Sequence, residues 1–128
     1  MIYLDTSVLL AQLFAEDRFP PEEFWKQTLV SSRLIEYEAW TRIHARRLSK
    51  SHGEQARVLL SRLAMLELLP TVLARVLEPF PAGVRTLDAL HLASADFLRK
   101  RDPTLAIATY DQQMAAVASA MHLPVVMP

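Results

Sequence analysis

The sequence predicts an α/β protein in which helices cover both faces of a parallel sheet. Short β-type runs alternate with helical segments along the whole chain, and this alternation is typical of strand-helix-strand units. The 128 residues fit one domain, and 52% of them are hydrophobic, enough for a sizeable core. With only two glycines, the chain lacks the Gly-rich loop of a P-loop enzyme. We therefore expect a single domain over residues 1–128 with four to five strands.

The first half of the chain predicts two strands, a capped helix and a helical hairpin. Strands are indicated by short apolar runs, and helix starts by Thr6 or Ser7 and by the proline pair before residue 22. Gly53 is expected to mark the turn of the hairpin. The predicted elements are, in order, a strand at Ile2–Leu4, a helix to about Ala15, a short helix at 20–28, a strand at Leu29–Ser32 and paired helices at 34–50 and 54–69.

The second half is divided by prolines at positions 70, 79 and 81, which are expected to break the chain. Thr86 can cap the next helix, and the cations at 99–101 suit its last turn. The predicted elements are a third strand at Leu66–Leu69, for which helix is nearly as good a fit, a helix at 87–101, a strand at 105–109, a helix at 111–122 and a closing strand at 124–127.

Composition narrows the classes of protein that the chain can represent. Fourteen basic and fourteen acidic residues give no net charge, so contacts with nucleic acid must rely on local patches. The absence of cysteine excludes disulfides and thiolate metal sites and suits a reducing cytoplasm. No apolar run is long enough to span a bilayer, and the first residues lack the basic region of a signal peptide. We expect a soluble cytoplasmic protein with no membrane contact.

Four acidic residues are expected at one edge of the predicted sheet. Asp5 directly follows the first strand, and Asp111 follows the strand at 105–109. Glu38 lies in the first turns of the helix after the strand at Leu29–Ser32, and Asp88 lies in the first turn of the helix before the strand at 105–109. Ligands of open parallel sheets bind outside the carboxyl ends of the strands, where the strand order reverses. The four carboxylates are therefore expected to meet in one crevice.

Such a cluster of carboxylates needs protons or a bound cation, because the charges repel. Oxygen ligands without cysteine favour Mg²⁺, with Mn²⁺ as a substitute, over zinc. A divalent ion can activate water for attack on a phosphodiester, and a second ion can stabilise the leaving oxygen. Each acid also has a purely structural alternative: Asp5 and Asp111 can cap helices, and Asp88 can complement a helix dipole.

Four segments in this order resemble a PIN domain of the VapC type, the toxin half of bacterial toxin-antitoxin pairs: IYLDTSVLL, SSRLIEYEAW, RTLDALHLASA and ATYDQQMAAVA. The resemblance covers the whole chain and implies a three-layer α/β/α sandwich. It also implies a Mg²⁺-dependent endoribonuclease that is held inactive by a small VapB-like antitoxin. By the motif match, the metal-binding acidic positions are Asp5, Glu38, Asp88 and Asp111, with the hydroxyl of Thr6 or Ser7 beside the first.

Glu38 has a competitor in Glu36, since the two residues flank the apolar stripe of the same predicted helix. A helical wheel does not choose between them, and a surface pair with Arg42 is a structural alternative for Glu38. The family pattern favours Glu38. His91 is expected to pack or to form a structural hydrogen bond, and Asp96 to lie on a solvated face.

Substrate contacts are expected from basic residues near the crevice. The stretch TRIHARRLSKSH contains Arg42 and Arg46, and Arg85 precedes the predicted cap Thr86. Such cations commonly bind nucleic-acid phosphates, although a charge run is also typical of a solvated helix face. The expected substrate-binding residues are Thr6, Arg42, Arg46 and Arg85.

The alternative to a nuclease is a non-catalytic PIN-like scaffold that binds protein or nucleic-acid partners. An aspartyl-phosphate phosphatase is disfavoured because Ser7 stands where its second aspartate belongs. As in the family that the chain resembles, a homodimer formed through apolar helix faces is expected.

Overall fold

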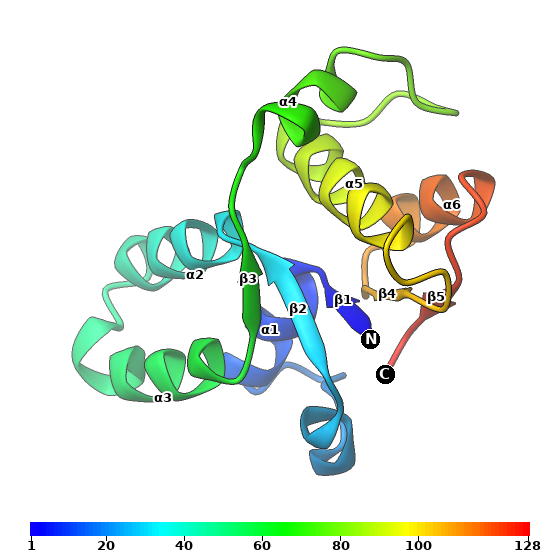
Figure 1. The fold of residues 1–128 in the computed structure, drawn as a ribbon. Helices are drawn as coiled ribbons and strands as arrows, with labels where there is room; N and C mark the ends of the chain where they lie inside the picture. Colours follow the sequence, from blue (N-terminus) through cyan, green and yellow to red (C-terminus); the bar gives the residue numbers. More distant parts are fainter.

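Five short parallel strands form one sheet in the order β3-β2-β1-β4-β5 (Figure 1). The computed structural model describes residues 1–128. Each strand spans two to four residues; their bounds are β1 Ile2–Leu4, β2 Leu29–Ser32, β3 Ala64–Leu66, β4 Ala106–Ala108 and β5 Val125–Val126. The chain adds β2 and β3 on one side of β1 and then crosses to add β4 and β5 on the other side. The strand order therefore reverses between β1 and β4.

Helices connect the strands and enclose the sheet between two layers, which confirms the predicted α/β/α sandwich (Figure 1). One layer contains α1, α2 and α3, and the other contains α5 and α6. The helices are α1 Thr6–Leu13, α2 Leu34–Ala45, α3 Ser49–Ser61, α4 Pro70–Val76, α5 Thr86–Arg99 and α6 Gln112–Ala120, with a 3-10 turn η1 at Glu22–Lys26.

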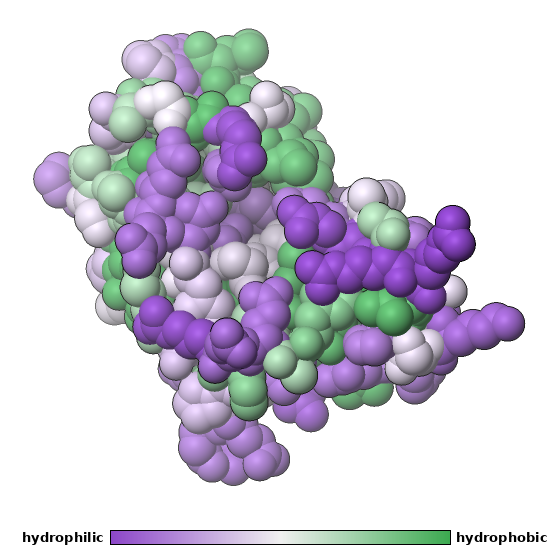
Figure 2. Space-filling view, turned by 180° about the vertical axis from the view of Figure 1, so that it is seen from behind, coloured by the Kyte–Doolittle hydropathy of each residue, from purple (hydrophilic) through white to green (hydrophobic).

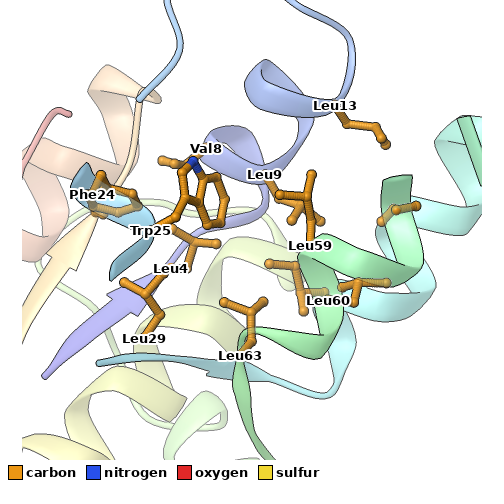
Figure 3. Packing of buried hydrophobic residues seen from close by; sticks show 14 of the residues in the cluster. Leu4, Val8, Leu9, Leu13, Phe24, Trp25, Leu29, Leu59, Leu60 and Leu63 are labelled. Carbon is orange, nitrogen blue, oxygen red and sulfur yellow. The ribbon is translucent and has the colours of Figure 1, made fainter. Parts of the chain in front are cut away.

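The sheet is buried on both faces because successive strand residues point to opposite sides. Leu4 faces the core under α1, α2 and α3, whereas its neighbour Tyr3 faces the core under α5 and α6. Figure 3 shows the first core, where Leu4 and Leu29 of the sheet meet leucines of α1 and α3 beside the Trp25 ring. The two cores hold β1 rigidly in the centre of the molecule.

Two predicted helix caps differ from the structure. Asp5 is the N-cap of α1, and its side chain accepts from the Ser7 N–H, so neither Thr6 nor Ser7 is the cap. Thr86 is the first residue of α5, and Arg85 occupies the cap position without a side-chain bond. The helices begin as expected, but the residue before each predicted cap carries the extended backbone that a cap requires.

The hairpin turn does not lie at Gly53. The break between α2 and α3 falls at residues 46–48, where Arg47 adopts a positive φ of 56°. Gly53 lies inside α3, and a β-carbon there would stand 3.3 Å from the Trp40 ring. Glycine is therefore used for close packing of the two helices rather than for a turn.

The middle of the chain also departs from the prediction. α3 ends at Ser61, so β3 comes at Ala64–Leu66, earlier than the predicted run at Leu66–Leu69. Pro70 does not break the chain but opens α4, since proline fits the first turn of a helix. None of the helices is both long enough and apolar enough to cross a membrane.

Candidate functional site

A cavity of about 590 Å³ opens at the carboxyl end of β1, where the strand order reverses. Its volume lies within the range of ligand sites, roughly 300 to 1,000 Å³. All four predicted acids line it: Asp5, Glu38, Asp88 and Asp111. Glu16, which the sequence did not single out, also lines the cavity. Figure 2 shows hydrophilic side chains gathered across the middle of one face of the molecule and over the side that carries α2 and α3.

Asp5 is held by hydroxyl groups and not by a cation. Only 5% of the residue is exposed. Its Oδ2 accepts from Ser7 Oγ at 2.6 Å and from Thr109 Oγ1 at 2.8 Å. The backbone N–H of Asp5 donates to the Ala108 carbonyl of β4. One carboxylate oxygen is thus fixed between β1 and β4, while Oδ1 receives no hydrogen bond.

Glu38 is held by a buried chain of hydrogen bonds that begins in the sheet. Its Oε1 accepts from Thr6 Oγ1 at 2.8 Å and lies 2.6 Å from His91 Nε2. On the other side of the ring, Nδ1 lies 2.7 Å from the Tyr3 hydroxyl, which accepts from the Ser32 N–H. Burial raises the pKa of Tyr3 far above its usual range, so the phenol keeps its proton. Because a carboxylate oxygen accepts, Nε2 is the ring nitrogen that donates to Glu38.

Asp111 and Asp88 complete the set. Asp111 caps α6, with Oδ1 accepting from the Met114 N–H at 3.0 Å. Its own N–H donates to Thr109 Oγ1, the hydroxyl that also holds Asp5. Asp88 lies in the first turn of α5, 3.9 Å from the largely exposed Arg85 guanidinium. A single threonine therefore links two of the acids.

The acids act on one another electrostatically. Burial, together with the negative charges of Asp5 and Asp111, raises the pKa of Asp88, and Arg85 only partly offsets this effect. Neither Asp5 nor Asp111 forms an ion pair. The cavity therefore holds five acidic residues against two arginines, so the protein neutralises its negative charge only in part.

This arrangement fits a hydrated divalent cation. In Asp5, Glu38 and Asp111 one carboxylate oxygen is held by hydrogen bonds and the other receives none. The open oxygens are hard donors of the kind that Mg²⁺ and Mn²⁺ prefer. No three acidic or histidine side chains converge closely enough to enclose a bare ion. Mg²⁺ does not need such a cluster, because it commonly keeps several waters and takes only one or two carboxylates directly.

The geometry separates Glu38 from its competitor Glu36. Glu36 pairs with Arg33 outside the cavity at 3.2 Å. Glu38 lines the cavity and forms no pair with Arg42. The ambiguity left by the helical wheel disappears because contacts from α1 and α5 select one carboxylate of α2.

The predicted substrate contacts divide into two groups. Arg42 and Arg85 line the cavity. Arg46 does not: its guanidinium lies 4.2 Å from the centre of the Phe14 ring. Thr6 lines the cavity, but it is buried and its hydroxyl donates to Glu38, so it orients the carboxylate.

Asp96 does not lie on a solvated face, contrary to the prediction. It is only 9% exposed, and it pairs with Arg99 of its own helix and with Arg75 of α4 at 3.5 Å. His91 is fully buried and forms structural hydrogen bonds, as predicted. Neither Tyr3 nor Thr109 was assigned a role from the sequence. Thr109 ends the run that precedes Asp111, and that position was the available signal.

Fold and site together define the class of protein. Residues 2–120 match the PIN domain family, so the chain belongs to that family, as its motifs indicate. The five-stranded parallel sheet and the acidic cavity at its reversal point are the parts of this fold that position the site.

Within the class, the chain is similar to ribonucleases named VapC. It is 35% identical to Ribonuclease VapC47 of Mycobacterium tuberculosis over 89% of this chain and 87% of that protein. It is 31% identical to Ribonuclease VapC35 of the same organism over 100% and 97% of the two chains. Its fold also resembles a toxin-antitoxin complex from Klebsiella pneumoniae, with a TM-score of 0.66, 17% identity and coverage of 100% and 98%.

Proposed function

We propose that this protein is a divalent-metal-dependent endoribonuclease and the toxin of a toxin-antitoxin pair. The observation that carries the proposal is the single cavity lined by Asp5, Glu38, Asp88 and Asp111, three of which have one oxygen held and one open. The similarity to VapC ribonucleases supports RNA as the substrate.

The chain's own residues hold and orient the reacting groups. Asp5, Glu38, Asp88 and Asp111 would bind Mg²⁺, which lowers the pKa of water and stabilises charge on the leaving oxygen. Ser7 and Thr109 fix the carboxylate of Asp5, and His91 and Thr6 fix that of Glu38. Because Thr6, His91 and Thr109 are buried, the open oxygens keep their positions when substrate enters.

The two arginines of the cavity would bind the RNA backbone. Arg42 comes from α2 and Arg85 from the residue before α5, so they approach the cavity from different elements. Guanidinium groups bind phosphate through paired hydrogen bonds. We assign to them the phosphates on either side of the bond that is cut, and to the acids the scissile phosphate itself.

Two partners follow from the same proposal. A small VapB-like antitoxin would hold the enzyme inactive, and the likeness in fold to a toxin-antitoxin complex supports this partner. The proposal also includes a homodimer, which the resemblance to the family implies.

The test uses purified, antitoxin-free protein with total bacterial RNA in Mg²⁺ or Mn²⁺. We expect cleavage that EDTA stops, and a loss of about 100-fold or more in Asp5→Asn, because that change removes charge from the ion's ligand set. Mn²⁺ at 100 times its Kd should also stabilise the folded wild type by about 2.7 kcal/mol. Its melting temperature should therefore rise, whereas that of Asp5→Asn should not.

The non-catalytic scaffold is the outcome if the protein neither binds Mn²⁺ nor cuts RNA. Induced expression supplies a second check, since a toxin should stop growth and Asp5→Asn should relieve the arrest. Unaffected growth on wild-type induction would remove the toxin role.

A further inference from the structure

Most aromatic rings of this protein are either buried or covered by an arginine, and one uncovered ring lies at the cavity. Of ten aromatic residues, Tyr3, Phe24 and Trp25 are buried in the cores. Five others have an arginine over the ring at 4.2 to 5.1 Å from its centre; they are Phe14, Trp40, Phe80, Phe97 and Tyr110. Only Phe19 and Tyr37 remain uncovered, and of these only Tyr37 lines the cavity.

Tyr37 belongs to the face of α2 that forms one wall of the cavity. The wall residues of this helix are Leu34, Tyr37, Glu38, Thr41 and Arg42. Their spacing of three and four residues defines a single helix face. Glu38 is half-buried, whereas Tyr37 is 66% exposed. The ring therefore stands at the mouth of the cavity, next in sequence to a carboxylate of the site.

Nothing in the fold accounts for this ring. Its hydroxyl forms no hydrogen bond, and only its backbone carbonyl is engaged, by Thr41 Oγ1. A large apolar side chain exposed in this way contributes little burial energy to folding. Leu87 of α5, 48% exposed, lines the same cavity, so a second apolar side chain is available there.

We propose that Tyr37 is a stacking platform for a nucleobase of the RNA, next to the phosphate that is cut; this proposal rests on the ribonuclease function proposed above. Single-stranded RNA is commonly recognised by bases that stack on aromatic side chains. Arg42, one turn further along α2, supplies a phosphate contact beside the ring. One face of α2 thus offers an aromatic ring to the base of a nucleotide and a guanidinium to its phosphate. Tyr37 would strengthen binding without choosing strongly among bases, because every base has a π-face.

The experiment compares Tyr37→Ala with two controls. Tyr37→Phe keeps the ring and loses the hydroxyl, and Phe19→Ala removes the other uncovered ring, which lies outside the cavity. The probe is a synthetic RNA that spans the main cut site mapped in total bacterial RNA. We expect Tyr37→Ala to raise KM roughly 5- to 150-fold with little change in kcat, the range that base stacking gives. Both controls should stay within about twofold of wild type.

A substrate with one base removed identifies the stacked nucleotide. Removal of that base should raise KM for the wild type but add nothing in Tyr37→Ala, because the two changes delete the same contact. Additive penalties at every position, or an unchanged KM in Tyr37→Ala, would overturn the proposal and leave the ring to a protein partner.

A binding measurement keeps this proposal separate from the nuclease function. Anisotropy of a labelled, mixed-sequence, single-stranded RNA in EDTA reports affinity without cleavage. If the wild type cuts no RNA but binds it more tightly than Tyr37→Ala does, the nuclease proposal fails and stacking stands. If the two proteins bind equally, stacking fails whether or not the wild type cuts.

Discussion

The two ends of α5 hold aspartates in opposite electrostatic environments. Asp96, near the carboxyl end, is paired with Arg75 and Arg99. Asp88, in the first turn, faces the charges of Asp5 and Asp111 and has only the exposed Arg85 at 3.9 Å. Two aspartates eight residues apart on one helix therefore lie in different electrostatic environments. The charge of Asp96 is neutralised by two arginines, whereas that of Asp88 is only partly offset.

The same contrast appears on α2. Glu36 pairs with an arginine on the surface, whereas two residues later Glu38 meets only a hydroxyl and an imidazole. Ion pairing inside the chain thus distinguishes the two candidates that the sequence left open.

The largest expected effect comes from matched changes at these two glutamates. Glu38→Gln should lower RNA cleavage by about 100-fold, because it removes charge from an oxygen placed for the cation. Glu36→Gln should stay within about twofold, since an exposed ion pair contributes little. Initial rates on one RNA substrate measure both. Loss of activity in the Glu36 variant, with activity kept in the Glu38 variant, would contradict the assignment of Glu38 to the site.

The next effect concerns stability and not catalysis. Asp96→Asn keeps the shape of the side chain but leaves Arg75 and Arg99 without their charge partner. We expect the free energy of unfolding to fall by about 1 to 3 kcal/mol, measured by urea titration, with cleavage at room temperature retained. Glu54→Gln, which removes an exposed pair with Arg57, is the matched control and should cost less than about 1 kcal/mol. Equal losses in both variants would show that the ion pairs of Asp96 contribute no more to the free energy of unfolding than an exposed pair does.

The smallest effect is a pH dependence at Asp88. Because its pKa is raised in the folded protein, the folded chain retains a proton that the unfolded chain has already released. Stability then falls as the pH rises from the ordinary pKa of 3.8 through the raised value. In EDTA, Asp88→Asn should therefore melt above the wild type at neutral pH and lose this advantage at about pH 3. A variant that is less stable at neutral pH would mean that the helix dipole outweighs burial and the neighbouring carboxylates.

Much of this contrast could be predicted from the sequence, but only for residues at the ends of elements. Asp5 and Asp111 follow apolar runs, and the rule for parallel sheets then brings them to one edge. The fold class was predicted from the alternation of short apolar runs with helical segments, and the parallel sheet between two helical layers confirms it. The roles of the four acids as metal ligands and the substrate contacts of Arg42 and Arg85 stay predictions.

What the sequence did not show depends on contacts between distant segments. Asp96 was expected in solvent, but its partner Arg75 lies on α4, a helix that was not predicted because Pro70 was expected to break the chain. Gly53 was interpreted as a turn because the contact with Trp40 on the neighbouring helix cannot be deduced from spacing. Arg46 lies outside the cavity because its guanidinium covers Phe14 at the end of α1. In each case tertiary packing decides between local alternatives of similar quality.

The link between Asp5 and Thr109 also determines when the acidic cavity can form during synthesis of the chain. The two side chains that meet here are 104 positions apart in the chain. While the ribosome has released only the earlier segments, the first strand has no β4 beside it and Asp111 does not yet exist outside the exit tunnel. Long-range pairings of this kind form late. A growing polypeptide therefore cannot assemble the acidic cavity until the segment around Asp111 has emerged.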